Sequence, residues 1–441
     1  MMAERAPPVN AIWPDATNAG ASTRRSHNAM EPPDQPVALS TIAREWGRIG
    51  CTGFGGPPAH IALLRQLCVQ DRGWLSPGEM QDAIAATNLL PGPASTQLSI
   101  YCAWRLRGVL GALVGGFCFI VPGLVLILFL AALFLARHAP LWVSGAAAGA
   151  GSAVAAVALG AAARLMPASW ARVGAAIAGR ARWVGYAAAG AASSALIGPY
   201  LVLVLLAAGL AEVGVRHLHR PSPPAPGASS GGSDGGGGAG PLANPGHLVN
   251  LPRLAYIVAT VVPASGLGAL AWVAFKVGAL SYGGGFVIVP LMQSDAVHHY
   301  HWMTNAQFLD AVALGQVTPG PVVQTVAVVG YAAAGIGGGL LAAAIAFAPS
   351  FLFILFGARR FGVLRANPSV QAFLTGAGPA AIGAIAGSSI PLALALAHIW
   401  QVGVLAAAVL WLLPLRRGVV ACLLAAGVVG VVAAFAGLPV R

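Results

Sequence analysis

Two related segments of the chain, 228 residues apart, constrain its fold more than any other feature. Residues 50–97 align with residues 278–325 without a gap, and twelve of the 48 pairs are identical. The identities fall on unusual residues: Gly55-Gly56 matches Gly283-Gly284, Trp74 matches Trp302, Asp82 matches Asp310, and Pro91-Gly92-Pro93 matches Pro319-Gly320-Pro321. An internal match of this kind indicates two copies of one structural unit.

The two copies are separated by a tract rich in Pro, Gly and Ser at residues 221–247, which has the composition of a flexible linker. We therefore predict a disordered N-terminal tail at 1–37, a first repeat at 38–215, a linker at 216–250 and a second repeat at 251–441. The tail is polar and rich in proline, and it lacks the apolar core of a cleavable signal. We expect it to lie in the cytoplasm.

The composition places both copies in a membrane. Hydrophobic residues make up 57% of the chain and charged residues only 8%, whereas soluble domains carry about 25% charged residues. Residues 108–136 and 139–163 are apolar stretches longer than the roughly 20 residues that cross a bilayer. The formal net charge of +12 could suggest a nucleic-acid partner. Because basic residues gather in the short loops of membrane proteins, we expect lipid contact and no nucleic acid.

Helices that stop partway across the membrane are expected in each copy. Ser76 to Glu79 and Thr304 to Gln307 have the pattern of helix-capping boxes. Each helix can run roughly thirteen residues, or about 20 Å, before a Pro-Gly-Pro segment removes backbone donors. Residues 54–58 and 282–286 also interrupt apolar stretches, and such breaks are tolerated only inside protein or along a cavity. We predict an all-α polytopic membrane protein with two homologous repeats, each made of re-entrant hairpins followed by full spans.

The distribution of basic residues favours inverted repeats. If residues 184–215 cross the membrane once, 18 of the 24 basic residues lie on the cytoplasmic side, as the positive-inside rule requires. The other six are Arg137, Arg216, Arg220, Arg253, Lys276 and Arg441. Inverted repeats with broken helices are common among secondary transporters. The alternative is that Gly198-Pro199 splits 184–215 into two spans, which would make the halves parallel.

The breaks are also where we expect an anion to bind. A half-helix that begins after a break points free N–H groups and a positive dipole end into the protein. The predicted anion-binding residues are Gly55, Gly56, Pro91, Gly92, Pro93, Ser95, Thr96, Gln97, Gly283, Gly284, Pro319, Gly320, Pro321, Gln324 and Thr325. The alternative is structural, since proline and glycine also kink closely packed helices.

Several charged residues have both a functional and a structural interpretation. Asp82 and Asp310 are the acids at matched positions of the repeats, which makes them candidates for proton coupling. Both also lie near a helix start, where the helix dipole stabilises a carboxylate. Arg65, Arg105 and Lys276 are candidates for attracting an anion to a vestibule, although basic side chains also anchor topology.

The metal-ligating residue types do not form a recognisable motif. His298, His299 and His301 cluster near Asp295 without a cysteine, and the five cysteines include no CxxC pair. We predict no metal and no cofactor. A membrane-embedded enzyme that modifies an oxyanion is the alternative class, which the lack of redox and nucleotide motifs argues against.

Phe54-Gly55-Gly56-Pro57, the stretch from Trp74 to Glu79, and Pro91-Gly92-Pro93 resemble the chromate ion transporter family in its two-domain bacterial form, as do their counterparts 228 residues later. The resemblance covers residues 38–437. It implies a multi-pass protein of the bacterial inner membrane that exports chromate and confers chromate resistance. From the lack of redox and nucleotide motifs, we expect no enzymatic activity. Sulfate is implied as a competing or exchanged ion, because both are tetrahedral dianions of similar size.

Alternatives within this reading are a sulfate or other oxyanion carrier and an anion channel, and we also allow for a homodimer. The second repeat departs from the first in two places. Gly285 stands where the first repeat has Pro57, and Arg105 and Arg107 have no equivalents. The halves are therefore expected to contribute unequally.

Overall fold

The fold is taken from a computed structural model that describes residues 37–88, 90–136, 139–174, 176–196, 201–218, 266–281, 288–358 and 367–440. The chain divides into Met1–Pro36 and Val37–Arg441, and all described residues belong to the second unit. Residues 1–36 of the predicted tail, most of the predicted linker, and Gly283 and Gly284 lie outside the described residues. Within these ranges all regular structure is helical, which confirms the all-α prediction.

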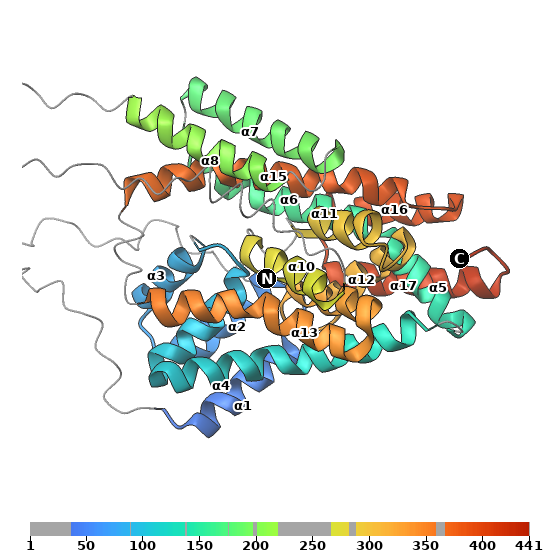
Figure 1. Ribbon diagram of the computed structural model, residues 1–441, viewed down its shortest axis with the longest axis horizontal. Coiled ribbons are helices and arrows are strands. Elements are labelled where there is room, and N and C mark those ends of the chain that lie inside the picture. The colour runs from blue at the N-terminus through green and yellow to red at the C-terminus, as the bar shows by residue number, and fades with distance from the viewer. Residues whose placement is uncertain are drawn as a thin grey trace, which may run out of the picture. The chain divides into compact units, whose positions relative to one another are not determined.

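Both halves begin alike, with a helix, a shorter helix that runs into a π-helical turn, a short capped helix and then a long helix (Figure 1). The first half contains α1 (Leu39–Thr52), α2 (Pro57–Arg65), a π-helical turn η1 (Gln66–Asp71), α3 (Pro77–Thr87), α4 (Ala94–Phe134), α5 (Leu141–Ser152), α6 (Val154–Ala171), α7 (Ile177–Leu196) and α8 (Leu201–Leu218). The second half contains α10 (Leu267–Leu280), α11 (Ile288–Gln293), a π-helical turn η3 (Ser294–His299), α12 (Asn305–Val317), a 3₁₀ turn η4 (Val322–Gln324), α13 (Thr325–Gly357), α15 (Pro368–Leu394), α16 (Ile399–Leu412) and α17 (Val419–Phe435).

Five helical segments of the described chain are long and apolar enough to cross a membrane. They are Ala94–Phe134, Leu141–Ala171, Leu201–Leu218, Val322–Gly357 and Pro368–Leu394. Large apolar side chains point outward from them: Phe117 and Phe129 on α4 are both 65% exposed. Exposed apolar area of this kind is suited to lipid. The chain is therefore a multi-pass membrane protein.

The predicted short helices are present. Ser76 caps α3 and Thr304 caps α12, each through a complete capping box. The helices contain 11 and 13 residues, and both end just before a Pro-Gly-Pro segment. The central glycines, Gly92 and Gly320, have φ angles of 116° and 102°, which a side chain would strain. The breaks therefore follow from local sequence alone.

Helices α4 and α13 each contain a tight reversal that divides them into a short and a long arm. The reversals lie at Arg107-Gly108 and Ala334-Gly335, where the glycines have φ angles of 59° and 63°. After each reversal a glycine packs on a carbonyl eight residues earlier: Gly111 lies against Ala103 and Gly338 against Gly330. The short arms follow the Pro-Gly-Pro breaks, and the long arms, 109–134 and 336–357, form spans.

The reversals are 227 residues apart rather than 228, because the second half has one residue fewer after its break. Pro93 is followed by three residues before Gln97, and Pro321 by two before Gln324. The tighter 3₁₀ turn η4 occupies this shorter stretch. Gln97 is therefore the counterpart of Gln324.

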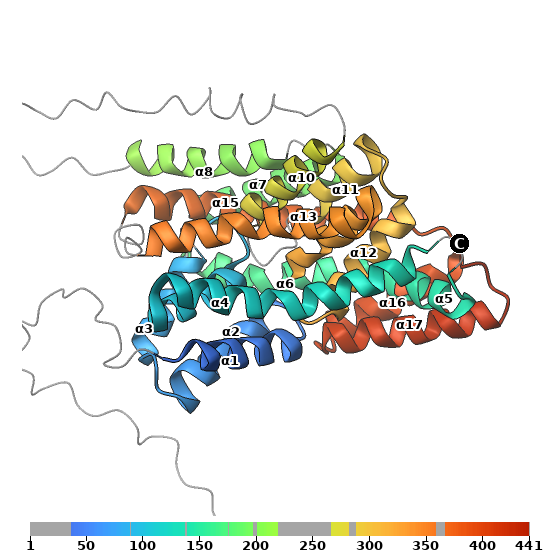
Figure 2. The same cartoon turned by 60° about the horizontal axis from the view of Figure 1, so that its bottom comes forward.

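The two long arms run antiparallel. Gly116 lies against Phe351, whereas Gly339 lies against Leu128, so residue numbers rise along α4 as they fall along α13. Because the arms are equivalent elements, the two halves have opposite orientations. Figures 1 and 2 show the same relation for the short helices, with α3 at one end and α12 towards the other.

Residues 184–215, which the count of basic residues treats as a single crossing, do not form one helix. That stretch contains two helices, α7 and α8, which pack against each other and against α15. The alternative was that two spans in this stretch would make the halves parallel. The halves are not parallel, because α4 and α13 run antiparallel. The Gly198-Pro199 pair falls between α7 and α8 in the sequence and lies outside the described residues.

The C-terminal helices of each half pack on the other half. Helix α15 lies against α6, α7 and α8, while α17 lies against α5 and α16 against α6. Small residues allow close approach: Gly190 packs on the carbonyl of Ala380, and Gly149 on that of Ala426. The two repeats are thus interlocked and do not form separate bodies.

Candidate substrate-binding site

A helix begins directly after each of the two Pro-Gly-Pro breaks, inside the protein core. Pro93 and Pro321 stand at the N-caps of α4 and η4 without a side-chain cap. The polar residues that follow are buried: Ser95, Thr96, Gln97, Gln324 and Thr325 are each at most 2% exposed. The first turn of a helix leaves its N–H groups without intrahelical partners. Two positive helix ends are therefore enclosed by protein.

Each break lies against the first broken helix of the other half. The amide of Gly320 donates to the carbonyl of Gly53, just after α1, at 3.1 Å. Gly92 approaches the carbonyl of Gly278 on α10, where a methyl group would lie 3.4 Å from the oxygen. A methyl group on Gly56 would similarly lie 3.5 Å from a methyl of Val322. Gly56 and both breaks thus belong to one region, while Gly55 is exposed.

The equivalent glutamines make different hydrogen bonds. Gln97 donates from Nε2 to the carbonyl of Pro91 at 2.7 Å, closing its own break. Gln324 donates from Nε2 to the carbonyl of Ile120 on α4, also at 2.7 Å, and so reaches the other half. Gly123 packs directly on the carbonyl of Pro319 and on the Gln324 amide. The missing side chain of Gly123 lets α4 approach the second break.

Several buried polar atoms of this region have no hydrogen-bond partner among the described residues. They are Thr96 Oγ1, Gln97 Oε1 and Gln324 Oε1. Such atoms are rare in native proteins because each carries an uncompensated desolvation cost. Thr325 differs, since its hydroxyl donates to the carbonyl of Val322 at 2.8 Å. A small polar ligand near these atoms would supply what they lack.

The structure adds His60, which the sequence interpretation did not identify. It is fully buried, with Nε2 2.8 Å from the carbonyl of Gly53 and Nδ1 3.4 Å from Ser95 Oγ. Because a carbonyl only accepts, Nε2 carries the proton. The Gly53 carbonyl thus receives bonds from both His60 and Gly320. The repeat comparison could not reveal His60, since its counterpart is Ile288; the available signal was a histidine in an apolar stretch just after a break.

The predicted vestibule cations are partly neutralised. Arg105 forms an ion pair with Glu79 at 2.9 Å, and Lys276 forms one with Asp295 at 2.6 Å. Arg65 is exposed. Glu79, interpreted from sequence as a cap, is a cap and an ion-pair partner at once. Pairing of this kind weakens the positive field that Arg105 and Lys276 could offer an approaching anion.

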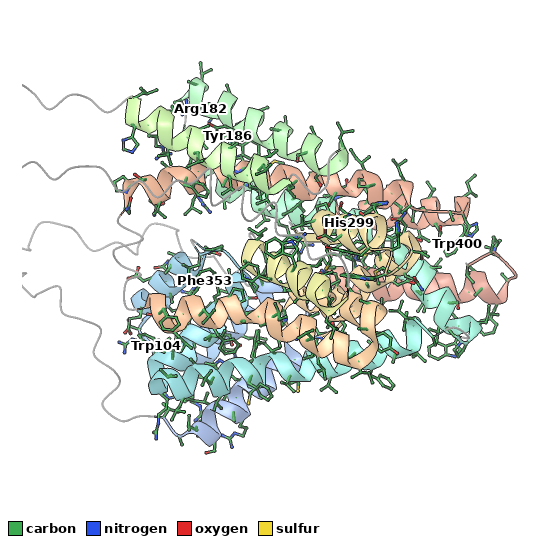
Figure 3. The ribbon with its side chains drawn as sticks, viewed as in Figure 1. Trp104, Arg182, Tyr186, His299, Phe353 and Trp400 are labelled. Carbon is green, nitrogen blue, oxygen red and sulfur yellow. The ribbon has the colours of Figure 1, made fainter. Side chains whose placement is uncertain are left out.

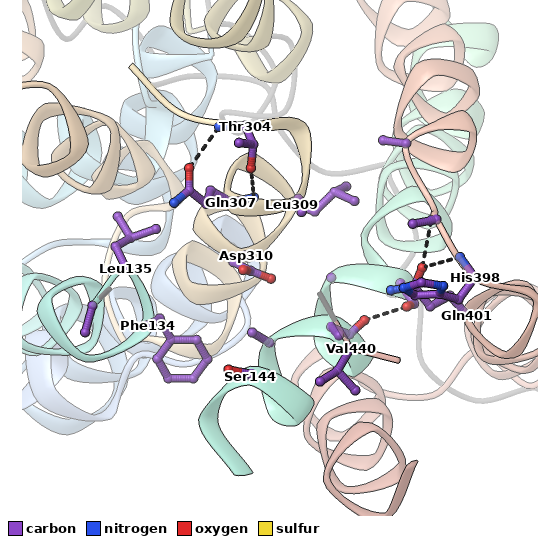
Figure 4. Close-up of a pocket in the computed structure, with 18 residues that line it drawn as sticks. Phe134, Leu135, Ser144, Thr304, Gln307, Leu309, Asp310, His398, Gln401 and Val440 are labelled. Carbon is purple, nitrogen blue, oxygen red and sulfur yellow. Dashed lines mark hydrogen bonds between the residues drawn. The ribbon is translucent and has the colours of Figure 1, made fainter. Parts of the chain in front are cut away.

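The two matched acids have different surroundings. Asp82 is exposed on α3. Asp310 is partly buried on α12 and lines a cavity of about 420 Å³, which Figure 4 shows between α12 and the segments that carry Ser144 and Gln401. No cluster of three His, Cys, Asp or Glu residues suited to a metal occurs in the described part of the chain.

Comparison with known proteins identifies the family. The family profile described as "Chromate transporter" matches residues 40–213 and 268–431. The chain is 30% identical over 390 residues to the "Chromate transport protein" of Cupriavidus metallidurans, covering 83% of this chain and 88% of that protein. It is 29% identical over 363 residues to a protein of the same description from Pseudomonas aeruginosa, covering 81% and 82%.

The "Probable chromate transport protein" of Synechococcus elongatus is 28% identical over 360 residues, covering 80% of this chain and 84% of that protein. No solved structure matches the chain. The profile covers both halves, and the relatives align along most of their length. The chain belongs to the chromate transporter family.

Proposed function

We propose that this protein is a secondary carrier that exports chromate across a bacterial inner membrane and thereby confers chromate resistance. Relatives that align with most of the chain are described as chromate transport proteins. The observation that carries the proposal is the pair of buried helix starts with unpartnered polar atoms beside them. Chromate is a tetrahedral dianion whose oxygens accept hydrogen bonds from such groups.

In this proposal the anion lies between the two breaks. The first-turn N–H groups of α4 and η4 and the hydroxyl of Thr96 donate to its oxygens. Gln97 and Gln324 can rotate their amides from a backbone carbonyl to the anion. Gly55 and Gly56 border the path by which the anion enters the site. We assign the same role to Gly283 and Gly284, which lie outside the described residues. Arg65, Arg105 and Lys276 offset the anion's charge on the way in.

Opposite orientation of the halves supports alternating access. Each break contacts the other half, so a movement of one half against the other exposes the same site to one side and then the other. A channel would need a continuous path instead. Sulfate is the second candidate cargo, because its shape and charge would satisfy the same donors. The homodimer remains a prediction.

Uptake of labelled chromate into everted membrane vesicles tests the function, since uptake there corresponds to export from the cell. We expect saturable uptake that vesicles without the protein lack, with sulfate competing weakly. No chromate uptake would refute the proposal. A cargo preference reversed towards sulfate would identify a sulfate carrier, and a linear, unsaturating current would identify a channel.

Thr96→Val tests the site with little change of shape. Its hydroxyl has no partner to lose, so the fold should be unaffected, whereas one hydrogen bond to a charged ligand contributes about 1.5–3 kcal/mol. We expect the KM for chromate to rise about tenfold or more. Thr87→Val is the matched control, because Thr87 is equally buried but bonds to its own helix. An unchanged KM in Thr96→Val would remove this residue from the site.

Leucine at either central glycine tests the breaks themselves. Gly92→Leu and Gly320→Leu place a side chain where φ is 116° and 102° and where the glutamine amides lie. Transport should be lost while membrane insertion, followed by detection of the protein in the membrane fraction, is kept. Normal transport in either variant would contradict a site at the helix starts.

A further inference from the structure

The cavity beside Asp310 is lined by elements of both halves. Helix α12 supplies Gln307 and Asp310, and α5 supplies Ser144 and Ser152. The end of α4, residues 395–401 and Val440 complete the wall. Its volume of about 420 Å³ has room for several water molecules, each of which takes about 30 Å³ of liquid volume. The carboxyl group of Asp310 therefore borders both the space for water and the apolar side chains that line the cavity.

Asp310 forms no ion pair with a described residue. Gly151 on α5 faces it so closely that a methyl group there would lie 3.2 Å from Oδ1. Ala147, Ala148 and Gly151 on α5 offer no side-chain hydrogen bond to a charged carboxylate. Close packing of α5 on Asp310 therefore disfavours the ionised carboxylate. The neutral acid carries no charge to solvate, and so it tolerates this packing.

None of the other titratable groups on the elements around Asp310 forms an ion pair with it among the described residues. His398 lines the same cavity and makes contacts of its own. Among the described residues, the remaining elements packed on α12 carry titratable groups that do not line the cavity: Arg164 on α6, Cys422 on α17, Asp295, His298 and His299 on η3, Tyr331 on α13, and Tyr101, Cys102, Arg105, Arg107 and Cys118 on α4.

The cavity lies towards the end of the molecule opposite the end that carries Arg182 and Arg216. Figure 3 labels Arg182 and Trp104 towards one end and Trp400 and His299 towards the other. His398 and Gln401, which line the cavity, flank Trp400 in the sequence. Arg182 and Arg216 meet at Glu212, and basic residues favour the cytoplasmic side. The cavity thus faces the outer side.

We propose that Asp310 is the proton-binding group of this carrier, loaded from the outer side through the cavity, and that Asp82 has no such role. A proton joins the carboxylate to give a neutral acid, and the same O–H bond breaks on release. Burial raises the pKa of Asp310, which lies on a helix too short to span the membrane, to about 7. Its assignment as the coupling group rests on the proposed carrier function, whereas its protonation does not.

Protonation has a direct route to the anion site. Helix α12 carries Asp310 and ends at the second break, so the charge of this side chain and the position of Pro319 belong to one rigid element. A neutral Asp310 lets α12 pack on α5 at Gly151. An ionised Asp310 favours the water of the cavity and draws α12 away from α5. Proton binding would thereby move one of the two breaks.

Labelling with dicyclohexylcarbodiimide, which modifies protonated carboxyls in apolar surroundings, tests protonation in the purified full-length protein. We expect mass spectrometry to find Asp310 modified about tenfold faster one pH unit below 7 than one unit above it. Asp82, which is exposed, is the internal control and should stay unmodified. Equal modification of both acids, or modification of Asp310 independent of pH, would overturn the proposal. Protection by sodium ions at constant pH would assign the cavity to a metal cation instead.

Transport variants test coupling separately. Asp310→Asn should abolish stimulation of chromate uptake by an imposed pH gradient, while chromate-for-chromate exchange, which needs no net proton movement, stays measurable. Asp82→Asn should keep the stimulation. Retained stimulation in Asp310→Asn would overturn the coupling role. If the protein carried no chromate, the labelling result would still stand or fall by itself.

Discussion

Gly123→Ala should impair transport through a single methyl group. Gly123 lies on the long arm of α4 where it passes the second break. A methyl group at this position would overlap the carbonyl oxygen of Pro319 and lie 2.6 Å from Gln324 Oε1. Both neighbours belong to the candidate site. The added carbon therefore forces either α4 or the break to move.

The magnitude follows from two opposing terms. Alanine in place of glycine favours a helix by about 1 kcal/mol, and overpacking of a tight contact costs about 1–3 kcal/mol. The net penalty of about 0–2 kcal/mol applies only to conformations that press α4 against the second break. A shift of about 1.4 kcal/mol changes a population tenfold. We therefore expect uptake to fall by up to about thirtyfold, without loss of folding.

Gly337→Ala on α13 is the matched control. It is also a helical glycine on a long arm, but no heavy atom lies within 4 Å of the added methyl group. It keeps the propensity gain and removes the clash, so its chromate uptake in everted vesicles, normalised to protein amount, should match that of the unmodified chain. Normal uptake in Gly123→Ala, or an equal loss in both variants, would refute the steric argument.

Two further predictions concern residues near the breaks. His60→Phe keeps a ring but loses the hydrogen bond to the Gly53 carbonyl, which should lower the free energy of unfolding by about 1 kcal/mol. His60→Gln is the control, because it retains a donor. Equal unfolding temperatures of the two variants in detergent would contradict this prediction. Burial acts to raise the pKa of Glu79, but hydrogen bonds from Ser76 and the charge of Arg105 lower it overall below 4.5. Ionised Glu79 therefore stabilises the fold above pH 4.5, and this contribution is lost as the pH falls through the lower folded pKa. Unfolding temperatures of Glu79→Gln should fall less steeply on acidification, and parallel curves would count against the ion pair.

Local signals made part of this fold predictable. Capping boxes and Pro-Gly-Pro segments act through the backbone of a few neighbouring residues, so the bounds of α3 and α12 agree with expectation. The apolar stretch predicted from residue 108 likewise begins at the Gly108 reversal. The division of 184–215 was harder, because the Gly198-Pro199 pair is compatible with a kink or with two helices.

The candidate site was less predictable, since its differences arise from tertiary contacts. Asp82 and Asp310 occupy matched positions, yet only Asp310 lines the cavity that α5 and residues 395–401 help to form. Gln97 and Gln324 are equivalent but donate to carbonyls of different halves. A repeat comparison assigns equal roles to such pairs. Only the packing of the other half distinguishes them.

The interlocked packing of the halves has a consequence for biosynthesis. Helices α7 and α8 find their partner in α15, and α5 finds its partner in α17. At about 5–20 residues per second, the roughly 220 residues from Leu218 to Phe435 take on the order of 10–40 s to translate. During that time the glycine-lined faces of the first half are bare in the bilayer. A newly made chain would therefore depend on the insertion machinery, or on lipids that shield those faces, until its last helix arrives.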